Sequence, residues 1–188
     1  MSSQRLILAS TSPRRKELLR RLGLAFDVVE PRFDESPTSR PAREECLHFA
    51  SEKALSVKDL CPDSLIIGCD TLIECEGEIL GKPEDVADAA RILAKLSDRT
   101  HRVHTGVVLL NTVTGETRGH VETAEVTFRK MTDQEVRDYV ATGEPMGKAG
   151  AYAVQGKARK LFIESVKGEE EAVIGLPLKI LREWLLNP

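Results

Sequence analysis

The fold is decided by LILASTSPRRKELL, residues 6–19, in which four apolar residues run into small hydroxyl residues and then into a proline. The apolar run is typical of a buried strand, and Pro13 suits the first position of a helix. Ser12 can cap that helix, whose free N–H groups and positive dipole end favour a bound anion. Arg14 and Arg15 add cationic donors. The stretch predicts a strand, a turn with an anion site and a helix, although an ordinary turn before a solvated basic helix also fits these residues.

The composition is that of a globular protein. Of the 188 residues, 41% are hydrophobic and 30% are charged, which argues against a disordered or fibrous chain. The net charge of −3 makes a large nucleic-acid surface unlikely. No apolar segment approaches the roughly 20 residues that a membrane span needs. We therefore expect a single domain, residues 1–188, with no membrane and no nucleic acid as partner.

The cysteines and histidines do not form a recognisable metal motif. The four cysteines have no CxxC spacing, and the chain does not begin with the apolar run of a signal peptide. Reduced thiols and a cytoplasmic protein are expected. His101 and His104 lie in an alternating strand pattern, which places side chains three residues apart on opposite faces. We do not expect these two histidines to share a metal.

Apolar periodicity predicts alternating strands and helices interrupted by hairpins. Strands are expected at residues 6–9, 26–29, 65–70, 71–75, 78–80, 101–111, 117–128 and 161–166. Helices are expected at residues 13–22, 42–60, 84–96, 133–142 and 177–186. Because the hairpins break the strand–helix alternation, the pattern indicates an α/β domain with a mixed sheet flanked by helices.

Two carboxylates are candidates for chemistry. Asp70 directly follows an apolar strand, and ligands of open α/β sheets gather at the carboxyl ends of strands. A carboxylate there can bind Mg²⁺ or accept a proton from water. Glu35, in a polar loop, could be a second ligand of the same metal. By themselves, a turn aspartate and a solvated loop glutamate are equally ordinary readings of the two residues.

Three lysines could bind phosphate. Lys53 lies among apolar helical neighbours, whereas Lys82 and Lys148 lie beside glycines, where the backbone can approach a phosphate chain. A solvated surface lysine is the ordinary alternative in each case. The segment around Lys148 is not a Walker A loop, because its glycines are too closely spaced and alanine follows the lysine. A serine hydrolase is also disfavoured, since no GxSxG motif occurs.

Seven short motifs, taken in order, closely resemble the Maf (septum-formation) family of nucleotide pyrophosphatases over nearly the whole chain. They are ASTSPRRKELL at 9–19, DE at 34–35, EKA at 52–54, GCDT at 68–71, GKP at 81–83, KAGAY at 148–152 and GLP at 175–177. Most are weak alone, but their ordered combination is specific. The resemblance implies a twisted mixed sheet like that of the inosine-triphosphate pyrophosphatases, with two lobes around a deep cleft, and often a homodimer.

The resemblance also implies a reaction and its residues. A nucleoside triphosphate would be hydrolysed to the monophosphate and pyrophosphate with Mg²⁺ or Mn²⁺ as cofactor. Asp70 would be the general base or a metal-organising carboxylate, and Glu35 its metal partner. Phosphates would be held by Ser10, Ser12, Arg15, Lys53 and Lys82.

Substrate choice in the family follows three positions, which here are Arg14, Thr71 and Gln155. They look like the branch that hydrolyses dTTP and UTP, whereas the 7-methyl-GTP branch has tryptophan, glutamine and glutamate there. A glutamine amide can both donate to and accept from a pyrimidine edge. A pyrimidine triphosphate, normal or modified, is therefore the expected substrate, and 7-methyl-GTP is the alternative.

Two departures from the dTTP branch stand out. Gly147 replaces an aspartate before Lys-Ala-Gly, which removes a carboxylate near the expected cleft. The acidic run 169–171 replaces small and aromatic residues before Gly-Leu-Pro. A different function also fits the basic helix: a regulatory cell-division or nucleic-acid-binding module without catalysis. That reading leaves Asp70 and the distributed lysines unexplained.

Overall fold

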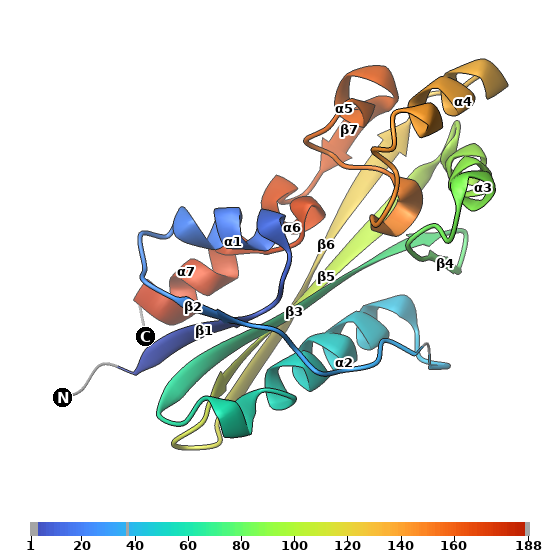
Figure 1. Ribbon diagram of the computed structural model, residues 1–188. Helices are drawn as coiled ribbons and strands as arrows, with labels where there is room; N and C mark the ends of the chain where they lie inside the picture. The colour runs from blue at the N-terminus through green and yellow to red at the C-terminus, as the bar shows by residue number, and fades with distance from the viewer. Residues whose placement is uncertain (1–3, 37, 187–188) are drawn as a thin grey trace. The chain divides into compact units, whose positions relative to one another are not determined.

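The computed structural model describes residues 4–36 and 38–186 (Figure 1). Its strands are β1 (Arg5–Ala9), β2 (Asp27–Val29), β3 (Ser64–Cys75), β4 (Glu78–Leu80), β5 (Thr100–Asn111), β6 (Thr117–Phe128) and β7 (Ile163–Lys167). Its α-helices are α1 (Pro13–Arg20), α2 (Ala42–Leu55), α3 (Val86–Leu96), α4 (Asp133–Ala141), α5 (Ala158–Leu161), α6 (Glu170–Ile174) and α7 (Leu178–Leu186). Two 3₁₀ turns, η1 (Lys58–Leu60) and η2 (Ala149–Ala151), complete the elements.

The sheet is mixed, as predicted. Its order is β2-β1-β3-β5-β6-β7, and β4 pairs with β3 outside this path. β1 runs parallel to β2 and to β3, whereas β3 with β4 and β6 with β7 are antiparallel. The parallel pairs come from the strand–helix–strand opening of the chain, and the antiparallel pairs include the hairpin at Glu76 and Gly77.

The longest departure from the expected strands is β3. The sequence pattern predicts two strands, at 65–70 and 71–75, but the structure has one continuous strand over Ser64–Cys75. Its first part pairs with β1 up to Ala9 and Gly68, and its last part pairs with β4 from Ile73. The positions of β3 that are buried change where its neighbour changes from β1 to β4. In the sequence, this change in the apolar pattern resembles the end of one strand and the start of another.

Helix ends follow the local capping chemistry. Ser12 caps α1 with Pro13 at its start, and Thr132 and Glu135 form a capping box on α4. The helix expected at 42–60 ends at Leu55, with η1 following it. The short helices α5 and α6 were not predicted, because four or five residues show too little apolar periodicity.

The chain forms two compact units. Unit 1 comprises residues 1–70, 105–122 and 175–188, and unit 2 comprises residues 71–104 and 123–174. The expectation of a single domain with a cleft between lobes stays a prediction. None of the described helices is long and apolar enough to cross a membrane.

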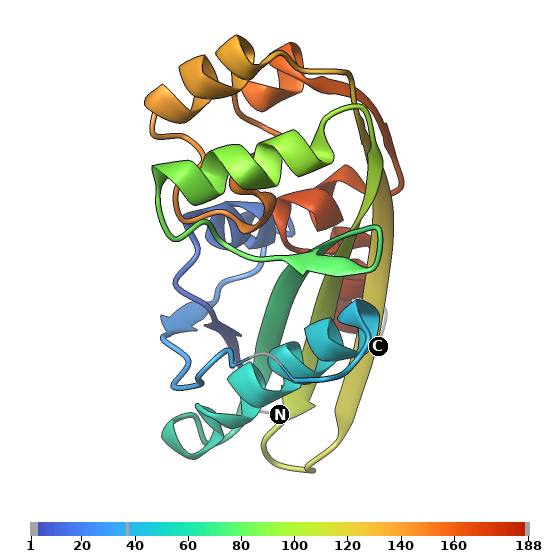
Figure 2. The same cartoon turned by 90° about the vertical axis from the view of Figure 1, so that its right-hand side faces the viewer.

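Unit 1 is built on β1 and the adjoining part of β3. Figure 1 shows α2 on one face of these strands and α1 and α7 on the other, and Figure 2 shows α2 from a second direction. Ala50 and Ala54 of α2 pack with Ile7 and Ile66 in one core cluster. A Cβ at Gly68 would lie 2.1 Å from the carbonyl oxygen of Ala50. The glycine therefore lets α2 lie directly on the sheet, which places Lys53 beside β3.

Unit 2 has a separate aromatic core. Phe128 and Tyr152 pack edge to face with ring centroids 5.0 Å apart, and Tyr139 meets Phe162 in the same way at 5.1 Å. These rings belong to a buried cluster that also contains the apolar face of α3. Tyr152 thereby fixes the segment that follows η2 to the core of this unit.

Candidate active site

A buried lysine joins two carboxylates in unit 1. Nζ of Lys53, on α2, lies 2.5 Å from Oδ1 of Asp70 and 2.6 Å from Oε1 of Glu35. The side chains of Lys53 and Asp70 are only 6% and 7% exposed, whereas that of Glu35 is 40% exposed. Since ionisable side chains are seldom buried without pairing, this triad is a feature that the fold holds at some cost.

Asp70 lies inside β3 and not at its end. The parallel pairing of β3 with β1 stops at Ala9 and Gly68, so Asp70 lies two residues beyond the end of β1. It therefore occupies the carboxyl edge of the parallel part of the sheet, which is where α/β folds bind ligands. The predicted strand end at Asp70 is therefore wrong, because β3 continues to Cys75, but Asp70 does follow the part of β3 that pairs with β1.

One oxygen of Asp70 has no hydrogen-bond partner among the described residues. Oδ1 is taken by Lys53, but Oδ2 is buried and unpaired. An unsatisfied buried carboxylate oxygen is costly, and such an atom needs a ligand, a metal or a water. The orientation of Asp70 thus leaves one oxygen available for chemistry while the other is held.

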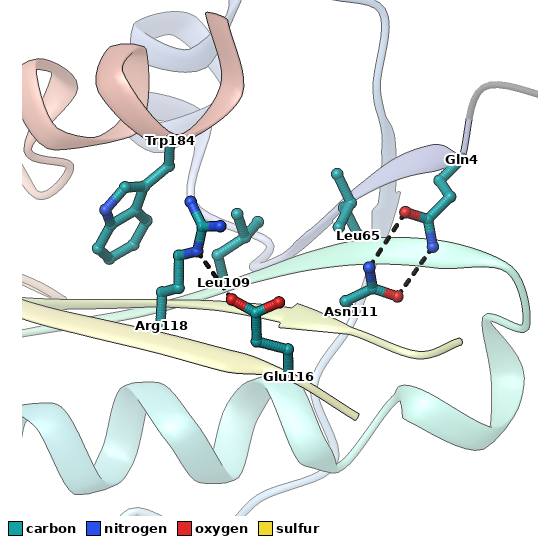
Figure 3. Close-up of a pocket in the computed structure, with 7 residues that line it drawn as sticks. All are labelled: Gln4, Leu65, Leu109, Asn111, Glu116, Arg118 and Trp184. Atoms are coloured by element: carbon teal, nitrogen blue, oxygen red, sulfur yellow. Dashed lines mark hydrogen bonds and ion pairs between the residues drawn. The ribbon is translucent and has the colours of Figure 1, made fainter. Parts of the chain in front are cut away.

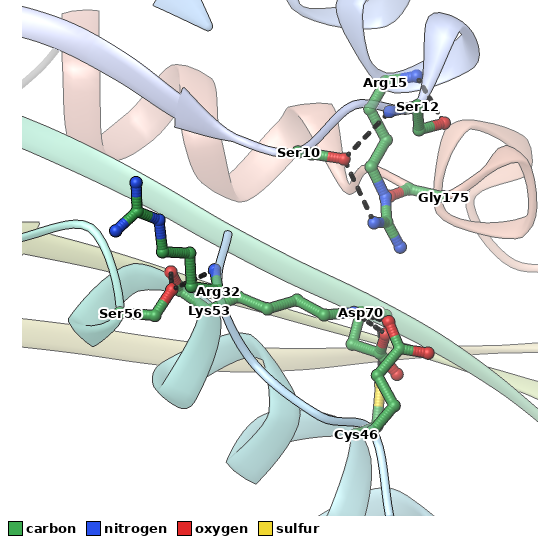
Figure 4. Close-up of polar contacts among 10 residues, drawn as sticks. Ser10, Ser12, Arg15, Arg32, Cys46, Lys53, Ser56, Asp70 and Gly175 are labelled. Atoms are coloured by element: carbon green, nitrogen blue, oxygen red, sulfur yellow. Dashed lines mark hydrogen bonds and ion pairs between the residues drawn. The ribbon is translucent and has the colours of Figure 1, made fainter. Parts of the chain in front are cut away.

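A thiol supports the backbone of Asp70. Sγ of Cys46 donates to the carbonyl oxygen of Asp70 at 3.2 Å (Figure 4). The same sulfur accepts the N–H of Gly106 at 2.8 Å. Cys46 is completely buried on α2. Sequence reasoning missed this role, because only the packing of α2 on the sheet brings the thiol to these backbone groups.

The turn between β1 and α1 forms a compact group of donors. Oγ of Ser10 accepts the N–H of Ser12 at 3.3 Å and Nη1 of Arg15 at 3.4 Å (Figure 4). Oγ of Ser12 accepts the N–H of Arg15 at 3.5 Å, which is the predicted cap. Nε of Arg15 donates to the carbonyl oxygen of Gly175 at 2.9 Å. The Arg15 side chain is therefore held by Ser10, near the N-terminus, and by the backbone of Gly175, near the C-terminus.

Arg15 and Asp70 act on each other electrostatically. Burial lowers the pKa of Arg15, but Cys69, Asp70, Cys46 and Glu35 together outweigh it, so that the pKa is raised overall. Burial also raises the pKa of the Cys69 thiol. Arg15 of the turn thus interacts electrostatically with both carboxylates of the triad, Asp70 and Glu35.

The structure brings six of the predicted residues together in unit 1, namely Ser10, Ser12, Arg15, Glu35, Lys53 and Asp70. Arg14 is exposed on α1 in the same unit. Thr71, Lys82 and Gln155 belong to unit 2: Thr71 follows Asp70 in β3, and Lys82 and Gln155 are exposed in loops. The Lys82 loop contacts the loop of Lys148, since the N–H of Gly150 donates to the carbonyl oxygen of Gly81 at 3.0 Å.

The carboxylates suit a hard divalent cation. Within the described residues no group of three His, Cys, Asp or Glu side chains could hold a metal ion. Oδ2 of Asp70 is nevertheless a buried oxygen donor without a partner, and Glu35 reaches the same Lys53 ammonium. Mg²⁺ at phosphate sites is held by one or two carboxylates together with waters and phosphate oxygens. Two protein carboxylates therefore fit such an ion.

Glu45 is a second residue that sequence reasoning missed. Its carboxylate is 1% exposed and accepts both the N–H and, at 2.6 Å, the hydroxyl of Thr38. This contact ties the loop that carries Glu35 to the first turn of α2. The sequence did contain a signal for this role, since Glu45 lies in the first turn of a predicted helix directly after a loop that contains proline.

Both departures from the family pattern have a local structural reason. Gly147 has φ +70°, a left-handed conformation that glycine adopts without strain. In the acidic run, Glu170 and Glu171 form the first turn of α6, and the backbone carbonyl oxygen of Glu169, just before it, accepts the N–H of Ala172 at 3.1 Å. Negative side chains are favourable at a helix N-terminus. The acidic run therefore begins helix α6, which the sequence analysis did not predict.

A shallow pocket in unit 1 is separate from these residues. It is lined by Gln4, Leu65, Leu109, Asn111, Glu116, Arg118 and Trp184 (Figure 3). Its amides bond each other at 2.9 and 3.2 Å, and Arg118 pairs with Glu116 at 3.2 Å. Because these polar groups satisfy one another, the pocket is a poor candidate for the active site.

Comparison with known proteins identifies the family of this chain. The Maf-like protein family model matches residues 5–187. A dTTP/UTP pyrophosphatase of Moorella thermoacetica is 47% identical, with 96% of this chain and 93% of that protein covered. Proteins of the same name from Pelotomaculum thermopropionicum and Vibrio vulnificus are 42% and 43% identical over 96% of this chain, with 94% and 99% of those proteins covered.

A solved structure shows the fold. The Staphylococcus aureus Ham1 protein matches with a TM-score of 0.55 and 14% identity, covering 98% of this chain and 99% of that one. The mixed α/β fold expected from the resemblance is thereby confirmed. The family match over nearly the whole chain, together with relatives above 40% identity, shows that this protein belongs to the Maf family.

Proposed function

We propose that this protein hydrolyses dTTP and UTP to the nucleoside monophosphate and pyrophosphate. The observation that carries the proposal is the buried Lys53–Asp70 pair, with one Asp70 oxygen unpaired, at the carboxyl edge of the parallel strands. The names of the most similar relatives support the substrate and the reaction. A buried carboxylate oxygen without a protein partner suits contact with a ligand, a metal or a water.

Cationic and hydroxyl side chains would bind the triphosphate. Ser10, Ser12 and Arg15 surround the N-terminus of α1, where free N–H groups and the helix dipole favour phosphate. Lys53 and Lys82 would add point charges. As water attacks the α-phosphorus, these groups stabilise the negative charge that is spread over the phosphate oxygens.

Asp70 would activate or align the attacking water. Lys53 holds Oδ1 at 2.5 Å, which fixes the carboxylate, and Oδ2 remains available to accept a proton or bind water. Asp70 and Glu35 would hold a divalent cation, Mg²⁺ or Mn²⁺. Such an ion, when bound, supplies a Lewis acid for phosphate oxygens.

Arg14, Thr71 and Gln155 would select the base. The Gln155 amide can donate to O4 and accept from N3–H of a uracil or thymine edge. Arg14 is exposed and Gln155 lies in an exposed turn, so both are available to a ligand. Neither side chain has the shape or charge that a methylated guanine would favour, which supports pyrimidine triphosphates.

We also propose a cytoplasmic homodimer on the strength of the family resemblance. The four cysteines are buried and no disulfide joins them, which suits a reducing compartment. Sedimentation equilibrium of the full chain tests the oligomeric state.

Pyrophosphate release tests the function. The panel contains dTTP, UTP, CTP, modified pyrimidine triphosphates, GTP, 7-methyl-GTP and ITP, with Mg²⁺, Mn²⁺ or EDTA. We expect metal-dependent turnover led by dTTP or UTP. Asp70→Asn should lower kcat at least about a hundredfold, because general-base catalysis contributes about 10²–10⁴.

Asp59→Asn is the matched control, since Asp59 is exposed in η1 of the same unit, and its turnover should be unchanged. Faster pyrophosphate release from 7-methyl-GTP than from dTTP or UTP would overturn the substrate assignment. Normal turnover by folded Asp70→Asn would overturn the role of Asp70. No pyrophosphate release from any nucleotide of the panel would instead favour a binding module without catalysis.

A further inference from the structure

One carboxylate closes the loop of unit 2 that carries Lys148 and Gln155. Glu144 stands at the start of this segment and Lys157 at its end. The N–H of Lys157 donates to Oε1 of Glu144 at 2.9 Å and to Oε2 at 3.2 Å. Residues 144–157 therefore form a closed loop whose end is fixed two residues after Gln155.

The Glu144 carboxylate is itself held in place. The hydroxyl of Tyr139, on α4, donates to Oε1 at 2.9 Å, and Tyr139 is 1% exposed in the aromatic core. Burial and this carboxylate both raise the pKa of Tyr139, so its hydroxyl remains a donor at neutral pH. The N–H of Glu144 donates to Oγ1 of Thr142 at 3.2 Å. The Glu144 carboxylate is therefore positioned by Tyr139, which belongs to the aromatic core of unit 2.

The backbone next to Gln155 is shaped to receive this carboxylate. A Cβ at Gly156 would lie 2.0 Å from Oε1 of Glu144 and 2.7 Å from its carboxyl carbon. A side chain at 156 would push the carboxylate away from this position, so glycine permits the close approach. Glu144, Gly156 and the N–H of Lys157 thus fit together as a built contact.

The same loop is fixed at further points. Nζ of Lys148 donates to the backbone oxygen of Glu144. The hydroxyl of Tyr152 bonds Nε2 of the buried His101 at 2.8 Å. The N–H of Gly156 also donates to the carbonyl oxygen of Ala153 at 3.0 Å. The loop is consequently held on both sides of Gln155, and the Glu144 contact at Lys157 ties this turn to the rest of the loop.

We propose that Glu144 is a positioning residue for base selection: its carboxylate sets the backbone at Gly156 and Lys157 and thereby places the Gln155 amide. This inference rests on the proposed function, in which Gln155 reads the base. Misplacement of a recognition group by about 1 Å can lower a rate by about a hundredfold. Loss of the contact should therefore affect discrimination between bases more than turnover of every triphosphate.

The test compares kcat/KM for UTP and CTP in the full-length wild type, Glu144→Ala, Glu144→Gln and a control, Glu164→Ala. UTP and CTP differ at C4 of the base, the edge that an amide can read. We expect Glu144→Ala to lower the UTP:CTP ratio at least about tenfold through KM for UTP. Glu144→Gln keeps an acceptor oxygen and should retain the ratio, as should Glu164→Ala, whose side chain is exposed on β7.

Amide hydrogen exchange at Lys157 gives a second readout that does not depend on activity. Exchange should be slow in the wild type and faster in Glu144→Ala. If Glu144→Ala does not fold, Tyr139→Phe removes one of the hydrogen bonds that hold the carboxylate and should produce a smaller shift in the ratio in the same direction.

The outcomes separate the two proposals. An unchanged UTP:CTP ratio in folded Glu144→Ala, or an equal loss for both substrates, overturns the positioning role while the proposed function stands. Absence of wild-type turnover with every pyrimidine triphosphate overturns the proposed function, and the role of Glu144 in base selection with it.

Discussion

Replacing Lys53 by methionine should destabilise the protein strongly before any substrate is added. Methionine keeps the length and the apolar stem of the side chain but removes the ammonium group between Asp70 and Glu35. Asp70, whose side chain is 7% exposed, would then keep a buried negative charge without the cation that lies 2.5 Å from it. The burial of this charge decides the size of the effect.

Removing one partner of a buried ion pair costs about 3–5 kcal/mol. Arg15 interacts favourably with Asp70 as well, so the lower end, about 3 kcal/mol, is expected. The contact with Glu35 adds little because that side chain is 40% exposed. For a chain of 188 residues, about 2–4 °C per kcal/mol gives a fall in Tm of about 6–12 °C.

Thermal unfolding followed by circular dichroism at pH 7, with EDTA and without nucleotide, measures this change. Lys58→Met is the matched control, because Lys58 is exposed in η1 of the same unit, and its effect should stay within about 0.5 kcal/mol. The double variant Lys53→Met/Asp70→Leu removes both charges. It should recover to within about 1 kcal/mol of the wild type, since apolar replacement of a whole buried pair is often neutral.

Two results would refute the reasoning. Lys53→Met with a Tm within 2 °C of the control, on the scale of about 2–4 °C per kcal/mol, would show that Asp70 does not depend on the ammonium group. A double variant no more stable than Lys53→Met would show that the loss came from packing and not from an uncompensated charge.

Three further predictions concern acid stability, close packing and metal. Burial lowers the pKa of His101 to about 4 from 6.5, so the unfolded chain binds a proton that the folded protein excludes, and stability should fall by about 3 kcal/mol as the pH drops from 6.5 to 4. Urea unfolding at several pH values checks this, and His101→Gln should show a shallower fall. Gly68→Ala should destabilise by about 1–3 kcal/mol, because its Cβ would meet the Ala50 carbonyl oxygen at 2.1 Å, whereas Gly81→Ala has open space and should change little in the same unfolding assay. EDTA should abolish pyrophosphate release from UTP, and added Mg²⁺ or Mn²⁺ should restore it; full activity in EDTA would contradict a metal held by Asp70 and Glu35.

Local chemistry made the start of the fold predictable from the sequence. The apolar run before Ser10, the cap at Ser12 and Pro13 specify β1, the turn and α1 by interactions within a few residues. The mixed sheet followed from hairpins that interrupt strand–helix alternation. The boundary expected inside β3 was wrong, because the change from β1 to β4 as partner is a tertiary event that alters the burial pattern without ending the strand.

The sequence also named the residues of the candidate site, but mainly through an ordered set of weak motifs. Spacing alone could not separate Lys53 from a solvated lysine or Asp70 from a turn aspartate. Only packing of α2 on β3 through Gly68 makes the two a buried pair and brings Cys46 to the Asp70 backbone. The Glu144 contact with Lys157 was invisible for the same reason, since it joins residues 13 positions apart.

The sequence by itself thus determined what short-range forces control: the turn between β1 and α1, most helices and strands, and the set of polar residue types proposed for phosphate chemistry. Tertiary structure alone decided which charges are buried, which oxygen of Asp70 is held and which is left unpaired, and which carboxylate closes the loop of Gln155. The physical reason is that burial and hydrogen bonding between distant segments depend on how elements pack, and periodicity along the chain carries no information about those partners.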